Sequence, residues 1–342
     1  MNASLNRRSF LSLSASFAAT ALAQPSRPSS GLGIASTSFT TPSAAGAARP
    51  TSLALLERCQ ALGAAGIQAN LSGDLPKLRA RAEELGMFLE GMVSLPRNGD
   101  VAGFERALLD AKASGATVVR SAALSGRRYE TFATTQAWID WRRQALDALK
   151  LAVPILEKHR MPLALENHKD FTLEELEPLL ASYSSEYLGV CLDFGNNVAL
   201  LDDPMEFAER MAPYALTTHV KDMGVQPYAD GFLLSEVLLG HGILDLPRML
   251  ALIRRARPRT RFILEMITRD PLKVPCLTDA YWAPFPERNG RHLARTMRLV
   301  TQRASREPLP TVSQLSREAR QAVEESNIRA CLAHFREKLQ PA

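Results

Sequence analysis

Residues of the kind that bind metal ions stand at the ends of four short apolar runs in the middle and late parts of the chain. The runs PLALE, GVCLD, LTTH and RFILE end at Glu166, Asp193, His219 and Glu265. Each run has the length and branched apolar content of a buried parallel strand, and parallel strands bring their last residues to one common face. Three carboxylates and one imidazole gathered there suit a single divalent cation, such as Mn²⁺, Mg²⁺, Co²⁺ or Zn²⁺. The sequence therefore predicts a metal centre.

A metal ion held by these four side chains leaves positions open for substrate oxygens. Such a site polarises a carbonyl and stabilises the enediolate that forms when a neighbouring carbon loses its proton. Glu166 and Glu265 are the candidate acid and base residues for this proton transfer. For any one strand-end carboxylate, the alternative is a helix cap or a pair with an arginine. Four such residues in succession, at matching strand ends, favour the metal centre.

Three polar residues close to these strand ends are candidates for substrate binding. His168 could hydrogen-bond a substrate oxygen or brace a metal ligand. Lys221 follows the histidine ligand by two residues and shares its strand face, so it could neutralise a developing oxyanion or pair with a neighbouring aspartate. Asn196 could orient the aspartate ligand or the substrate, or belong to an ordinary turn after a glycine.

Other candidates lie at the ends of earlier strands and in a late loop. Arg120 ends the run VVR and could grip a substrate hydroxyl or carboxylate. Arg269 and Trp282 belong to a loop rich in aromatic residues, which could stack on a sugar ring or pack against the rim of the barrel. Gln68 and Asn70, near the end of the second strand, could line the pocket or cap it.

Strand and helix patterns alternate along the chain, with eight of each. The expected strands cover 31–37, 66–71, 87–94, 117–124, 162–167, 188–194, 215–221 and 261–267. The expected helices cover 51–62, 76–85, 101–114, 136–159, 172–183, 204–211, 246–256 and 291–303. This alternation predicts an α/β fold of the (β/α)8 barrel type, with an open doubly wound sheet as the alternative. The barrel is favoured because the four metal-type ligands end the last four strands.

The chain divides into four predicted parts. They are a twin-arginine-type signal peptide at 1–23, a flexible leader at 24–30, the barrel at 31–305 and a C-terminal helical extension at 306–342. Two long connections, 223–242 and 267–289, leave the predicted catalytic face and are candidate lids.

The signal rests on Arg7 and Arg8, the apolar stretch after them and an A-x-A-like site before Gln24. It predicts a periplasmic or secreted protein, exported by the twin-arginine route and without a stable membrane anchor. The formal charge of +5 is small and spread along the chain, so no nucleic-acid partner is expected. A homo-oligomer is compatible with the sequence. The four cysteines are far apart, and disulfides are left open.

Taken together, the motifs LALENHKD, VCLDFGNN, THVKD, LGHGILDLPRML and FILEM resemble the xylose isomerase-like TIM-barrel superfamily. The resemblance covers most of the chain after the signal. It implies that Glu166, Asp193, His219 and Glu265 hold the metal, and that the two glutamates exchange the proton, as in the epimerase-like members. His241 stands between two glycines where relatives commonly have an acidic residue.

These observations predict a metal-dependent keto-sugar isomerase or epimerase whose substrate is a small carbohydrate. The first alternative is a dehydratase or lyase, in which the same enediolate expels a β-substituent from a keto-sugar or an oxidised glycoside. A non-catalytic sugar-binding barrel is a further alternative. A phosphoesterase with three metals is disfavoured, because three of the six histidines lie in helical stretches. No glycine-rich phosphate cradle supports a sugar-phosphate substrate.

Overall fold

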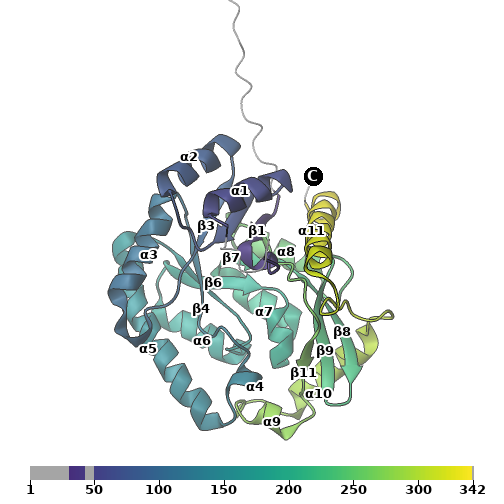
Figure 1. Ribbon diagram of the computed structural model, residues 1–342. Helices are drawn as coiled ribbons and strands as arrows, with labels where there is room; N and C mark the ends of the chain where they lie inside the picture. Colours follow the sequence, from purple (N-terminus) through teal and green to yellow (C-terminus); the bar gives the residue numbers. More distant parts are fainter. Residues whose placement is uncertain (1–30, 43–49, 341–342) are drawn as a thin grey trace, which may run out of the picture.

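The computed structural model describes residues 31–42 and 50–340, and it contains the predicted (β/α)8 barrel (Figure 1). Eight parallel strands follow the order β10-β1-β2-β3-β4-β5-β6-β7. The backbone N–H of Val220 donates to Ile263 O over 2.7 Å, and that of Glu265 donates to Val220 O over 3.1 Å, so the sheet closes between β7 and β10. The predicted signal peptide and leader lie outside the described residues.

All eight predicted strands are present, each shorter than its apolar run. They are β1 (Gly33–Ala35), β2 (Gly66–Ala69), β3 (Phe88–Met92), β4 (Val119–Ala122), β5 (Leu163–Glu166), β6 (Leu188–Asp193), β7 (Ala215–His219) and β10 (Ile263–Leu264). Asp193 and His219 are direct neighbours in the register of β6 and β7. Metal-type ligands therefore end three successive strands, and Glu265 directly follows β10.

Helices surround the strands on the outside of the barrel, as predicted (Figure 1). They are α1 (Ser52–Ala61), α2 (Leu75–Leu85), α3 (Val101–Ala113), α5 (Thr135–His159), α6 (Leu173–Tyr183), α7 (Pro204–Met211), α8 (Leu246–Ala256) and α10 (Gly290–Arg303). Aspartate, threonine or asparagine stands at the N-cap of each, where its side chain accepts a hydrogen bond from a backbone N–H that the helix leaves unpaired.

The connection 223–242 is not an irregular loop but is mostly a β-hairpin. Its strands β8 (Asp222–Tyr228) and β9 (Gly231–Val237) pair antiparallel, and β11 (Leu272–Val274), from the second long connection, adds a third strand. Short helices α4 (Arg128–Thr131) and α9 (Asp279–Trp282) lie near one another at the same side of the barrel (Figure 1). The two predicted lids are therefore joined to each other in one small sheet.

The predicted C-terminal extension contains α11 (Arg317–His334), followed by a π-helical turn over Phe335–Leu339. Its apolar residues Ile328, Leu332 and Phe335 are buried in the core. All four cysteines are buried and unbridged. Within the described residues, no helix has the length and apolar character needed to cross a membrane.

Candidate metal centre

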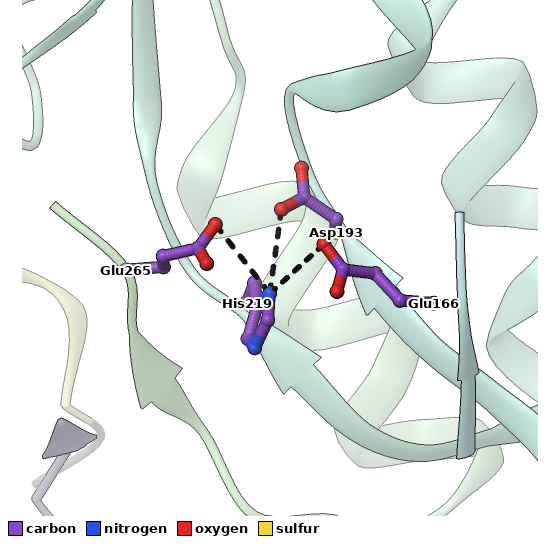
Figure 2. Close-up of side chains that lie close together, drawn as sticks. All are labelled: Glu166, Asp193, His219 and Glu265. Carbon is purple, nitrogen blue, oxygen red and sulfur yellow. Dashed lines mark ion pairs between the residues drawn. The ribbon is translucent and has the colours of Figure 1, made fainter. Parts of the chain in front are cut away.

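Four predicted metal ligands come together inside the barrel mouth (Figure 2). One ligand atom from each of Glu166, Asp193, His219 and Glu265 lies within 4.8 Å of the others, and all four residues are buried. His219 Nδ1 is 3.4 Å from Glu166 Oε1, 3.5 Å from Asp193 Oδ2 and 3.5 Å from Glu265 Oε2. The sequence therefore identified a set of side chains that share one point in space.

The chemistry of this donor set fits a divalent cation. His219 Nδ1 is buried and has no hydrogen-bond partner, although three carboxylates face it. Burial lowers the pKa of His219, but Cys191, Glu265 and Asp193 outweigh it and raise that pKa to about 10. The three carboxylates thus create a strong preference for positive charge at this point, which a bound cation would satisfy.

A chain of buried hydrogen bonds behind His219 fixes which of its nitrogens faces the carboxylates. His219 Nε2 is 2.7 Å from Gln68 Oε1, while Gln68 Nε2 donates to Glu90 Oε2 over 3.0 Å and the Thr217 hydroxyl donates to the same oxygen over 2.7 Å. Because the Gln68 amide donates to Glu90, its oxygen is left to accept from Nε2–H. When a cation displaces the proton from Nδ1, the lone pair of that atom would be directed at the ligand set, which is how metal-binding histidines are oriented.

Asp193 is held by the turn that follows β6. Its Oδ1 accepts hydrogen bonds from the backbone N–H of Gly195 at 2.9 Å and of Asn196 at 2.8 Å, so Oδ2 is left to face His219. The Asn167 side chain bonds the backbone of Asp193 in both directions. The predicted Asn196 also donates through Nδ2 to Glu166 Oε1 over 3.1 Å, so it orients two of the ligands.

Two predicted substrate-binding cations pair with the metal-type ligands. Lys221 Nζ lies 2.7 Å from Asp193 Oδ2 and also pairs with Glu265 Oε2, while Arg120 pairs with Glu166 Oε2. Burial lowers the pKa of Lys221, but the charges of Asp193 and Glu265 outweigh it and raise that pKa. Both cations therefore offset the negative charge of the carboxylates, which is the pairing that the sequence left open for Lys221.

Glu265 is fixed by the segment that follows β1. The hydroxyl of Thr37 donates to Glu265 Oε1 over 2.7 Å. The hydroxyl of Ser38 donates to Leu264 O over 3.3 Å and accepts from the backbone N–H of Met266 over 3.1 Å. Three successive residues at the end of β10 are thus held by one short turn, η1 (Ser36–Ser38).

The C-terminal helix α11 holds the segment that directly follows this turn. Buried Glu324 accepts three hydrogen bonds at Oε2, from the Thr40 and Thr41 backbone N–H groups at 2.8 and 3.1 Å and from the Thr40 hydroxyl at 3.1 Å. One helical turn further on, Asn327 donates to the Thr268 hydroxyl over 3.0 Å. Helix α11 therefore anchors both chain segments that flank Glu265.

Replacing Glu324 with alanine is expected to lower the free energy of unfolding by about 2–4 kcal/mol, since charge-assisted bonds to two backbone N–H groups are lost. It should also weaken metal binding several-fold, because Thr37 would no longer be held against Glu265. Denaturant melts and calorimetric titration with Mg²⁺ measure the two effects, with Glu325→Ala, at a half-buried glutamate of α11 that pairs with Arg329, as the control. Unchanged metal affinity in a destabilised variant would show that α11 stabilises the fold without positioning Glu265.

A pocket of about 210 Å³ opens beside Glu265. His168, Asn196 and Arg269, three of the predicted substrate-binding residues, line it. His168 Nδ1 lies 2.8 Å from Leu124 O, which leaves Nε2 as an acceptor, and burial, followed by the charges of Lys169 and Arg120, lowers the pKa of His168 to about 3. A neutral imidazole of this kind is suited to accept a hydrogen bond from a substrate hydroxyl.

Trp282 is not among the residues that line this pocket. Its indole N–H donates to Cys276 O over 2.9 Å, and its ring packs edge-on against Tyr281. Its substrate-binding role stays a prediction, and the observed contacts correspond to the rim packing that the sequence left open. Arg269, by contrast, reaches the pocket while it pairs with buried Glu236.

The glycine pair around His241 encloses a buried carboxylate. Asp222 accepts hydrogen bonds from the backbone N–H groups of Gly240 at 3.0 Å, Gly242 at 2.8 Å and Leu244 at 3.1 Å. A Cβ at Gly242 would lie 2.2 Å from Asp222 Oδ1, so the close approach requires glycine. His241 itself is exposed, between the two glycines that enclose this carboxylate.

A family model described as xylose isomerase-like TIM barrel matches residues 56–284. This chain belongs to that family. A 3-oxo-isoapionate decarboxylase of Pectobacterium atrosepticum is 30% identical over 205 residues, which cover 59% of this chain and 69% of the relative.

Solved structures of low sequence identity have the same fold. A xylose isomerase-like TIM barrel protein from Mycobacterium smegmatis, in complex with magnesium, is 16% identical, with a TM-score of 0.56 over 80% of this chain and 98% of that one. D-psicose 3-epimerase in the presence of D-fructose is 14% identical, with a TM-score of 0.58 over 91% of this chain and all of that one. These likenesses support the barrel fold of this chain.

Several residues of the site did not emerge from the sequence as candidates. Thr37, Glu90, Lys169 and Glu324 all touch the ligand set or the groups that hold it. Glu90 gave a usable signal, because a charged residue inside the apolar run MFLEGMV needs a partner inside the barrel. Thr37 and Glu324 gave none, because their partners are more than two hundred residues away in the chain.

Proposed function

We propose that this chain is a divalent-metal-dependent enzyme that moves the proton next to the carbonyl of a keto-sugar, as an isomerase or epimerase does through an enediolate. One observation carries the proposal. Glu166 and Glu265 approach His219 from opposite sides, each with an oxygen within 3.5 Å of its Nδ1 (Figure 2). A substrate carbon between them would have a carboxylate on each face, so one can remove a proton and the other can return it.

The positive charges around Glu265 keep its carboxyl group ionised. Burial raises its pKa, but the charges of His219, Lys221 and Arg120 hold the pKa of this carboxyl well below its usual range. Glu265 is therefore ionised and able to accept a proton. When bound, the divalent cation supplies Lewis-acid polarisation of the substrate carbonyl. Lys221, paired with Glu265 and Asp193, provides positive charge for the oxyanion side of the enediolate.

Decarboxylation is the second candidate, favoured by the 30% identity to a protein named 3-oxo-isoapionate decarboxylase. In a 3-oxo sugar acid, the bond from the α-carbon to the carboxylate breaks and CO₂ leaves. The electron pair stays on the α-carbon as the same type of enediolate, which then takes a proton from an acid of the site. Elimination of a β-substituent, as in a dehydratase, is a third fate of that intermediate. The three reactions share the need for the four-ligand centre.

Product analysis distinguishes these reactions. The Mg²⁺-loaded protein would be incubated with a panel of ketopentoses and ketohexoses and with freshly prepared 3-oxo sugar acids, and products would be followed by proton NMR and CO₂ release. A new epimer or aldose supports the first candidate. CO₂ release from the acids, above their spontaneous rate and lost with chelator, supports the second. Metal binding without any turnover would leave a sugar-binding barrel as the better account.

A further inference from the structure

Lys169 is a buried cation without a carboxylate partner. It is 4% exposed, and its Nζ donates to Asn196 Oδ1. Within residues 31–42 and 50–340, three other cations are buried to a similar degree, and each has an acidic partner: Arg128 with Glu175, Lys221 with Asp193 and Arg288 with Asp202. Lys169 forms no ion pair with any carboxylate of this described part of the chain.

Keeping a lysine at this position is costly for the fold. Burying an ammonium group without a counter-charge is unfavourable. Burial first, and then the positive charges of Lys221 and Arg269, lower the pKa of Lys169 to about 7. Its backbone has a φ of 62°, in the left-handed region that glycine or asparagine occupies more readily. A residue with a long side chain is strained in this conformation.

Lys169 lies close to the candidate metal centre. Lys169 lines the pocket beside Glu265, together with Arg269. Asn196, which accepts from Lys169, donates to Glu166, so only one side chain separates the ammonium from the metal-type ligands. Arg269 is already bidentate on Glu236, whereas Lys169 has unused N–H groups for a ligand. The two carboxylates that line this pocket, Glu130 and Glu265, pair with Arg127 and Lys221, so Lys169 is left without an anionic partner of its own.

We propose that Lys169 binds a carboxylate of the substrate, so that this enzyme acts on keto sugar acids. The inference rests on the proposed function in one respect, because the substrate carbonyl must lie at the four-ligand centre. Phosphate shares the same anionic chemistry. A carboxylate fits better, because one lysine and a small pocket provide few donors, whereas phosphate sites usually add backbone N–H groups at a helix start. The carboxylate is either the group that leaves as CO₂ or a handle that stays on the product.

Binding of unreactive ligands tests this without turnover. Calorimetric titration of the Mg²⁺-loaded protein would compare D-gluconate with D-glucitol, which has the same carbon chain but no carboxylate, and with D-glucitol 6-phosphate. Wild type should prefer gluconate to glucitol by about ten- to one-hundredfold. Lys169→Met and Lys169→Gln should each reduce this ratio to near one, while glucitol affinity stays constant. Lys273→Met, at an exposed lysine of β11, is the control.

Each other outcome overturns the inference in a recognisable way. A gluconate preference that survives in both variants would mean that the carboxylate binds the metal instead of Lys169. Equal loss of gluconate and glucitol binding would mean that Lys169 has a structural role, and thermal melts of the variants would show the accompanying loss of stability. A larger Lys169-dependent preference for the phosphate ester would identify phosphate as the ligand. None of these results depends on catalysis, so each is separate from a failure of the proposed function.

Discussion

Glu265→Gln is expected to abolish proton transfer while leaving the fold intact. Glutamine keeps an oxygen that can accept the hydrogen bond from Thr37, but it cannot accept a proton from a substrate carbon. Loss of a positioned general base typically reduces the rate by about 10²- to 10⁴-fold. The measurement is the turnover rate at saturating Mg²⁺, since the substitution also removes one charge from the ligand set.

The matched control for this variant is Glu287→Gln, an exposed glutamate in the same long connection, which should keep the wild-type rate. Circular dichroism and thermal melting would establish that both variants are folded. Full activity of Glu265→Gln at saturating metal would remove Glu265 from the acid and base roles. A loss that disappears at higher metal concentration would assign Glu265 to metal binding alone.

Asp193→Asn should remove metal binding with little damage to the fold. Oδ1 of Asp193 accepts two backbone hydrogen bonds from the following turn, and an asparagine oxygen can replace it there. The amide N–H₂ group would then point at His219 and Lys221, where Oδ2 stands now. A donor in that place repels a cation. Since loss of outer partners alone costs about 10- to 100-fold in metal affinity, this change should cost more than about a hundredfold.

Calorimetric titration with Mg²⁺ and metal analysis of the purified protein measure this loss. Asp230→Asn, in the exposed turn between β8 and β9, provides the control with the same chemical change. Wild-type metal affinity in Asp193→Asn would contradict the assignment of the metal centre to these four residues. The four residues would then form a buried polar cluster, paired with Lys221 and Arg120, and not the metal site.

Local pattern was sufficient to predict the barrel and the convergence of the four candidate ligands. Each strand is a short apolar run, and in closed parallel sheets the strand ends share one face, so Glu166, Asp193, His219 and Glu265 had to converge. The exact pairing register of neighbouring strands could not be predicted from the pattern. An irregularity in the pairing of β6 and β7, between Val190 and Cys191, brings Asp193 level with His219. No residue type in these strands indicates this irregularity.

The hairpin of β8 and β9 was missed although its turn carried a signal. Asp230 and Gly231 stand between two runs of strand-forming residues, and that dipeptide is typical of a hairpin turn. The prediction of a long connection used only its length and did not use this turn dipeptide. In the structure, Gly240 and Gly242 enclose the Asp222 carboxylate.

Lys169 could not be singled out from the sequence for a different reason. Its significance lies in a left-handed backbone, a buried ammonium and the lack of an ion-pair partner in the described part of the fold, and none of these is a property of the residue type. The residues that hold Glu265 in position could not be singled out from the sequence either. Thr37 and Glu324 act on Glu265 through contacts that only the closed barrel and its C-terminal helix create.

The most direct test of the account is deuterium exchange at the carbon next to the substrate carbonyl. The protein, loaded with Mg²⁺, would be incubated in D₂O with keto-sugars and keto sugar acids while proton NMR follows that carbon. The account predicts exchange, or deuterium uptake into a decarboxylated product, that stops when the metal is removed by chelator and returns when Mg²⁺ is restored. Protein with bound metal that exchanges no proton and releases no CO₂, or exchange that continues after the metal is removed, would contradict it.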